Sequence, residues 1–187
     1  MRVFVALDLP DEVRAALGEL IRALEATCRG ARWARVAAMH VTLRFIGEVT
    51  PEKVEKIQSQ LATVRSPSDV EMNFRGVGFF PNERHPRVFW AGIEATPNLS
   101  GLAADIERRM EMLGIPGEPR AFKPHLTLAR FKSEDGLARL REALAGRGPL
   151  EFGRACAGEF HLYQSRLKPG GAEYTRIATF PFAGDAP

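Results

Sequence analysis

The alternation of apolar and polar residues along the chain predicts a mixture of strands and amphipathic helices. Residues 3–8 form an apolar run of strand length, and Asp11 opens a helical pattern that ends near Gly30. Two further helical patterns run over 51–64 and 97–113. The remaining strands are expected near 39–46, 69–80, 87–94, 124–131, 150–165 and 173–180.

Capping residues mark the starts of two helices. Thr50 stands before Pro51, and threonine is favoured at the N-cap while proline is favoured in the first turn. Residues 133–135, Ser-Glu-Asp, predict a similar start for a fourth helix that runs to about Leu144. A turn over 168–171, Lys-Pro-Gly-Gly, is expected between the last two strands.

An internal repeat is the most informative feature of the chain. The segment His-Val-Thr-Leu at 40–43 is matched by His-Leu-Thr-Leu at 125–128, and each copy follows a helix and a loop and precedes another helix. We therefore expect an α+β fold with two similar lobes, each a mainly antiparallel sheet with helices on its outer face. The active-site cleft would lie between the lobes. No long linker interrupts the chain, so 1–187 is predicted to be a single two-lobed domain.

The repeat places chemically active groups side by side. Side chains alternate along a strand, so His40 and Thr42 share one face, and His125 and Thr127 share one in the second copy. Histidine titrates near neutral pH, so one imidazole can take a proton from water while the other protonates a departing oxygen. Threonine hydroxyls can donate to phosphate oxygens. This set of groups suits the hydrolysis of a strained cyclic phosphodiester.

Other roles for these residues are also considered. A single histidine in a strand is more often structural than catalytic, but the duplication favours catalysis. Zinc usually takes three or four His, Cys or carboxylate ligands, and each motif offers one imidazole, so neither a metal nor another cofactor is expected. A non-catalytic module that binds nucleotides or RNA is an alternative from a different class.

Two residues further along the motif strands are candidates for substrate binding. Phe45 and Arg130 each lie five positions after the motif histidine, where strict alternation would turn them to the opposite face. A bulge would return them to the face of the histidine. There Phe45 would stack on a base and Arg130 would hold phosphate. Core packing is the more common role for a phenylalanine such as Phe45.

The composition is that of an ordinary globular protein. Of the 187 residues, 45% are apolar and 26% are charged. The net charge of +3, carried mainly by arginine, suits a polyanionic partner, but an abundance of Arg, Ala and Gly is equally expected from a GC-rich genome. The N-terminal apolar run is too short to span a bilayer, so we expect a cytoplasmic protein with no membrane contact. We also expect it to be a monomer. Cys28 and Cys156 are expected to be reduced thiols.

The two motifs and their surroundings resemble the 2H phosphoesterase superfamily. The closer resemblance is to the RNA 2′,3′-cyclic phosphodiesterases, also called the LigT-like or 2′-5′ RNA ligase family, and it extends over nearly the whole chain. The segments that carry it are 2–7, 40–48, 79–81, 86–90, 124–130 and 162–165, together with Gly171 and Tyr174.

This resemblance implies metal-independent hydrolysis of a terminal RNA 2′,3′-cyclic phosphate to a 2′-phosphate. It also implies that His40 is the general acid toward the 3′ oxygen, that His125 activates water, and that Thr42 and Thr127 bind the phosphate. The expected substrates are RNA with a cyclic phosphate end and cyclic nucleotides. Members of the family are also described as joining tRNA halves through 2′-5′ linkages, so 2′-5′ RNA ligation is the alternative activity.

Overall fold

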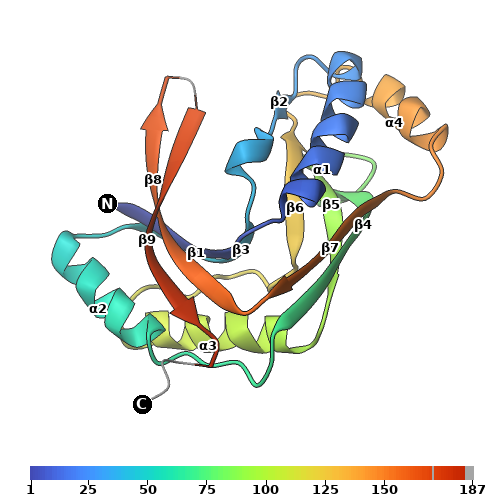
Figure 1. Ribbon diagram of the computed structural model, residues 1–187. Coiled ribbons are helices and arrows are strands. Elements are labelled where there is room, and N and C mark those ends of the chain that lie inside the picture. Colours follow the sequence, from blue (N-terminus) through green and yellow to red (C-terminus); the bar gives the residue numbers. More distant parts are fainter. Residues whose placement is uncertain (170, 184–187) are drawn as a thin grey trace.

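Two antiparallel sheets form the centre of the protein (Figure 1). The computed structural model describes residues 1–169 and 171–183. The first sheet has the strand order β3-β1-β8-β9 and consists of β1 (Arg2–Leu7), β3 (Val41–Glu48), β8 (Glu159–Lys168) and β9 (Gly171–Pro181). The second has the order β2-β6-β5-β4-β7 and consists of β2 (Arg32–Trp33), β4 (Val70–Phe80), β5 (Val88–Ala95), β6 (His125–Arg130) and β7 (Glu151–Ala157). The α+β architecture with antiparallel sheets is as predicted.

Two of the four helices that the structure describes contact the sheet opposite to the one that they follow in the chain. The helices are α1 (Asp11–Leu24), α2 (Pro51–Leu61), α3 (Asn98–Met112) and α4 (Leu137–Ala145), and short 3₁₀ turns cover Glu25–Thr27 and Val36–Ala38. Helix α1 follows β1 of the four-stranded sheet but contacts β7 of the five-stranded sheet, whereas α3 follows β5 and contacts β3 of the other sheet. Figure 1 shows α2 and α3 beside the first sheet, and α1 and α4 beside the second. Each sheet is therefore packed against a helix, α1 or α3, that follows a strand of the other sheet in the chain.

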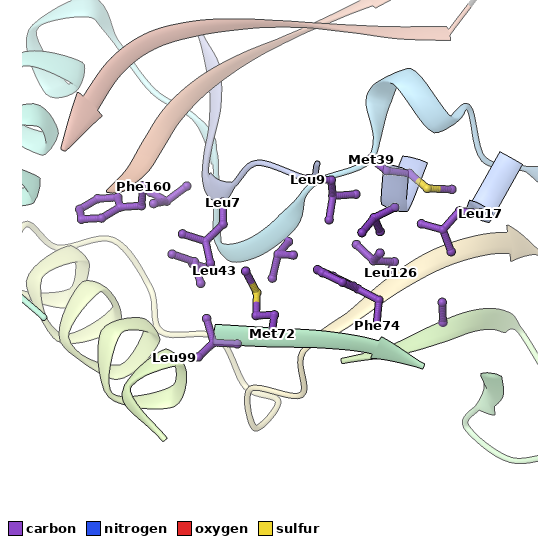
Figure 2. Packing of buried hydrophobic residues seen from close by; sticks show 14 of the residues in the cluster. Leu7, Leu9, Leu17, Met39, Leu43, Met72, Phe74, Leu99, Leu126 and Phe160 are labelled. Carbon is purple, nitrogen blue, oxygen red and sulfur yellow. The ribbon is translucent and has the colours of Figure 1, made fainter. Parts of the chain in front are cut away.

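One hydrophobic cluster extends through both sheets (Figure 2). The first motif strand contributes Val41 and Leu43 to it, and the second contributes Leu126 and Leu128. All four side chains are at most 6% exposed. Burying leucine or valine side chains of this kind stabilises a fold by about 1.5–3 kcal/mol each. The apolar side chains of both motifs therefore pack their strands against the same core.

The predicted helix starts differ in outcome. The Thr50 hydroxyl accepts a hydrogen bond from the Lys53 amide at 3.3 Å, as predicted for an N-cap. The predicted cap of the fourth helix is wrong, because α4 begins only at Leu137. The Ser133 hydroxyl bonds to the Asp135 carboxylate instead of a helix amide.

Gly136 is the residue directly before α4, at its N-cap position. It adopts a left-handed conformation with φ of 84°, and a Cβ there would lie 2.4 Å from the Thr27 carbonyl oxygen. Only glycine fits this close approach without strain. The close packing of this loop against the segment after α1 therefore sets the helix start. Of the predicted turn at 168–171, Gly170 lies outside the described residues.

Candidate active site

Both motif histidines have the same hydrogen bond to the main chain. His40 directly precedes β3, and its Nδ1 lies 3.2 Å from the carbonyl oxygen of Ala38. His125 is the first residue of β6, and its Nδ1 lies 2.7 Å from the carbonyl oxygen of Lys123. A carbonyl can only accept, so Nδ1 carries the proton in each ring. Nε2 is therefore the atom of each imidazole that gains or loses a proton.

A bulge in β3 brings Phe45 to the face of the motif threonine. Consecutive residues of β1 pair with Thr42 and Arg44, which leaves Leu43 as the extra residue. Thr42 and Phe45 consequently share the face that points away from the core. Phe45 is 43% exposed, so the alternative of core packing is wrong for this residue.

The same bulge occurs in β6. Consecutive residues of β5 pair with Thr127 and Ala129, which leaves Leu128 unpaired. Ala129 is fully buried, whereas Thr127 is half-buried and Arg130 is exposed. Arg130 therefore shares the face of His125 and Thr127. A strand without this extra residue would have turned the Arg130 guanidinium into the core.

Aromatic rings surround His40. Its ring centroid lies 4.4 Å from that of Tyr163, 5.7 Å from that of Tyr174 and 5.9 Å from that of Phe4. The His40 side chain is only 8% exposed. Burial lowers the pKa of His40 below its ordinary value, although the hydrogen bond to Ala38 and the charge of Asp8 act in the opposite direction.

Asp8, just beyond the end of β1, contacts His40 and polar side chains around it. One carboxylate oxygen accepts a hydrogen bond from the Tyr163 hydroxyl, and the other accepts one from the Arg176 guanidinium. The same carboxylate lies 3.8 Å from Nε2 of His40 and 3.6 Å from Nε2 of His161. Burial opposes the charged form of Asp8, but the Tyr163 hydrogen bond and the nearby positive charges lower its pKa overall.

His125 has a different environment. The Phe80 ring meets it edge-on, with centroids 5.1 Å apart, and Phe80 in turn contacts Trp90 at 5.2 Å. Trp90 is the cross-strand neighbour of Thr127, so these aromatic rings border the second motif. Within the part of the chain that the structure describes, no carboxylate lies within 4 Å of a His125 ring nitrogen. The two histidines thus share their backbone anchoring but differ in the charges around them.

Arg44 connects the first motif strand to the loop that leads to the second motif. Its side chain is 5% exposed, and its Nε lies 2.6 Å from the Glu107 carboxylate on α3. Another guanidinium nitrogen donates to the carbonyl oxygen of Pro116, and Glu118 lies 3.7 Å away. Residues 116 and 118 belong to the segment between α3 and β6. A buried arginine with these partners fixes the position of the segment between α3 and β6 relative to β3.

The structure groups the six predicted site residues in two sets of three, with His40, Thr42 and Phe45 at one sheet and His125, Thr127 and Arg130 at the other. Asp8, Tyr163 and Arg176 were not predicted. A charged residue directly after a buried strand was the one local signal for Asp8. Its partners lie more than 150 positions away, so no local pattern identifies them.

The remaining observations concern metals, membranes and thiols. Over 1–169 and 171–183, no three His, Cys, Asp or Glu side chains converge as a metal-binding group. No helix in those same ranges has the length and apolar character needed to cross a bilayer. Cys28 is buried and Cys156 is exposed, and both are free thiols, as expected.

Comparison with known proteins gives matches over nearly the full length of the chain. The family model for LigT-like phosphoesterases matches residues 7–90 and 93–174, which include both motifs. A Thermus thermophilus protein named RNA 2′,3′-cyclic phosphodiesterase is 38% identical over an alignment 195 positions long, which covers 99% of this chain and 92% of that protein.

Solved structures also match. A crystal structure of a Thermus thermophilus protein superimposes with a TM-score of 0.80 at 35% identity, and the match covers 100% of both chains. The crystal structure of E. coli LigT complexed with 3′-AMP has a TM-score of 0.77 at 27% identity, and the match covers 96% of this chain and 97% of that one.

Proposed function

Because this chain belongs to the LigT-like phosphoesterase family, we propose that it hydrolyses terminal 2′,3′-cyclic phosphates on RNA to 2′-phosphates. One observation carries the proposal: two imidazoles at equivalent places in a repeated strand, each with Nδ1 bound to a main-chain carbonyl. The name of the Thermus thermophilus relative supports the choice of reaction. The complex of E. coli LigT with 3′-AMP supports a ribonucleotide as the bound group.

In this proposal, Nε2 of His40 and Nε2 of His125 flank a single phosphorus atom. Both motif strands pack on one core, and Arg44 ties the first strand to the approach of the second. These contacts support a fixed spacing between the two rings. The chain is therefore one domain in this proposal. A single copy of it contains the whole site, and the protein acts as a monomer in the cytoplasm.

The reaction requires one proton transfer at each histidine. Nε2 of His125 takes a proton from water, and the water oxygen forms a bond to phosphorus. The bond between phosphorus and the 3′ oxygen breaks, and Nε2 of His40 gives its proton to that oxygen. The product carries a 2′-phosphate and a 3′-hydroxyl, and the two histidines then exchange a proton with solvent.

His40 must be protonated for this role. Its burial among Phe4, Tyr163 and Tyr174 favours the neutral ring, which lowers its pKa in the free protein. A bound phosphate places negative charge beside Nε2, and a nearby opposite charge favours the protonated ring. Substrate binding therefore helps to charge the proton donor.

The other predicted residues bind the substrate in this proposal. The Thr42 and Thr127 hydroxyls donate to non-bridging phosphate oxygens, where negative charge develops in the transition state. Arg130 contacts a phosphate oxygen from the same face as His125. Phe45 presents an exposed ring beside Thr42 and stacks on a base of the RNA.

An end-product assay tests the proposal. A short RNA with a 2′,3′-cyclic phosphate end is incubated with the protein in the presence of EDTA, and the terminal phosphate is identified by chromatography. We expect a 2′-phosphate. A 3′-phosphate, or activity that requires added metal, would contradict the mechanism. Joining of cleaved tRNA halves in preference to ring opening would favour ligation, and tight binding without turnover would favour a binding module.

A further inference from the structure

The two motif histidines differ in their nearby charges as well as in their burial, and their sequence motifs do not show this. His40 has the Asp8 carboxylate 3.8 Å from its Nε2, and His125 has no carboxylate within 4 Å among the described residues. Both rings are otherwise held alike, with Nδ1 on a carbonyl oxygen two residues earlier. The symmetric motif leaves the choice of proton donor open, so the surroundings must decide it.

Asp8 is held in place by several contacts. The Tyr163 hydroxyl donates to one carboxylate oxygen, and Arg176 donates to the other. The Asp8 side chain is 37% exposed, so it borders the motif face and is not part of the packed interior. These donors orient the carboxylate toward His40, and Arg176 offsets its negative charge for an approaching phosphate.

From this arrangement we infer that Asp8 is a positioning residue that makes His40, and not His125, the proton donor. The carboxylate stabilises the protonated imidazole of His40 at the atom that gives up the proton. It is too far from Nε2 for a hydrogen bond, so Nε2 stays available for the substrate. The inference rests on the proposed function, because it assigns roles within that reaction.

Other groups act on His40 from the elements packed around it. The titratable and charged groups are Arg14 on α1, His161 and Tyr163 on β8, and Tyr174 and Arg176 on β9. Arg14 and a protonated His161 disfavour the charged form of His40. Asp8 is the one carboxylate within 4 Å of His40 in the described part of the chain. Its removal should therefore leave burial and positive charge to lower the pKa of His40 further.

The test combines nuclear magnetic resonance with kinetics on Asp8→Asn. The chain has only four histidines, so each ring can be assigned and titrated. An opposite charge at this distance shifts a pKa by about 1–3 units, and Asp8 is partly exposed and shared with Arg176, so we expect the pKa of His40 to fall by about one unit. At pH 7.5 the protonated fraction of a donor then falls about tenfold, and kcat/KM falls with it.

Glu159→Gln is the matched control. Glu159 lies 3.6 Å from Nε2 of His161 and has no contact with His40, so the variant removes a carboxylate from the same cluster. Neither the pKa of His40 nor the rate should fall in it. Arg176→Gln is a second variant with the opposite sign, because loss of the positive charge beside Asp8 should raise the pKa of His40.

Three results would overturn the inference. An unchanged pKa of His40 in Asp8→Asn and Arg176→Gln would show that Asp8 does not act on this ring. A lowered pKa with an unchanged rate at pH 7.5 would show that His40 is not the donor. A wild-type protein that fails to open cyclic phosphates would overturn the proposed function and the donor role with it, while the titration would still show whether Asp8 acts on His40.

Discussion

Leu43 and Leu128 occupy equivalent bulges in β3 and β6, and each is the residue without a pairing partner in the neighbouring strand, β1 or β5. Both side chains are buried in the shared core. Because each leucine is one extra residue in its strand, the alternation of side chains shifts by one position after it, and Phe45 and Arg130 come to the face of the motif threonines. The repeat in the sequence is therefore also a repeat in backbone geometry, and it fixes which residues share a face with the motif threonines.

Replacing either motif histidine by asparagine should abolish most of the activity. His40→Asn and His125→Asn each remove a group that titrates, and acid–base help of this kind is typically worth about 10²–10⁴-fold in rate. The measurement is kcat on a 2′,3′-cyclic nucleotide, with circular dichroism to confirm folding. His85→Asn is the control, because His85 is exposed, pairs with Glu134 and belongs to neither motif. Equal losses in all three variants would contradict the assignment.

Phe45→Ala should weaken substrate binding without unfolding the protein. Stacking of a base on an aromatic ring is worth about 1–3 kcal/mol, so KM for a short RNA should rise about fivefold or more. The ring is 43% exposed, so the unfolding midpoint in urea should change little. Phe45→Tyr keeps an aromatic face and should retain the wild-type KM. An alanine variant with normal KM and lowered stability would instead assign Phe45 a packing role.

Acidification from pH 7.5 to 5.5 should destabilise the fold through its buried histidines. Burial lowers the pKa of His161, whose side chain is 3% exposed, and also lowers that of His40. The unfolded chain then binds protons below about pH 6.5 that the folded chain does not, so the free energy of unfolding falls as the pH drops through this window. The lowered pKa of Asp8 acts only near pH 4 and below, where the fold loses that contribution.

Urea unfolding of the wild type and of His161→Asn at both pH values measures this effect. The variant cannot bind a proton at position 161, so its stability should depend less on pH than that of the wild type. A steeper dependence in the variant would contradict the sign of the shift.

Gly78→Ala should destabilise the sheet that carries the second motif. A Cβ at Gly78 would lie 2.2 Å from the indole ring of Trp90, which is the cross-strand neighbour of Thr127. Forced repacking of this kind costs about 1–3 kcal/mol. Gly101→Ala is the matched control, since Gly101 lies in α3 with open space around it, and alanine should stabilise the helix by about 0.5–1 kcal/mol. Thermal unfolding of both variants distinguishes them, and equal shifts would contradict the packing argument.

The sequence by itself determined the types of the main elements and the pair of motif strands. Local periodicity predicts α3 closely, because a helix that buries one face repeats its apolar residues every three or four positions. The start of α1 at Asp11 is also as predicted, but this helix ends at Leu24, before a 3₁₀ turn, and not near Gly30. The duplicated His-x-Thr-Leu predicts that both histidines and both threonines are site residues, since strand alternation fixes their common face over two residues. The start of α4 was wrong, because close packing at Gly136 and not a local cap decides it.

Only the tertiary structure decided the rest of the site. The bulges at Leu43 and Leu128 arise from pairing with β1 and β5. Local periodicity does not show which strands pair or in which register, so it cannot predict these bulges. Asp8 meets Tyr163 and Arg176 across more than 150 residues, because β1 and β8 are neighbours in one sheet and β9 pairs with β8. The repeated motif carries two equal histidines, and the charges that make them unequal come from segments that only folding brings together.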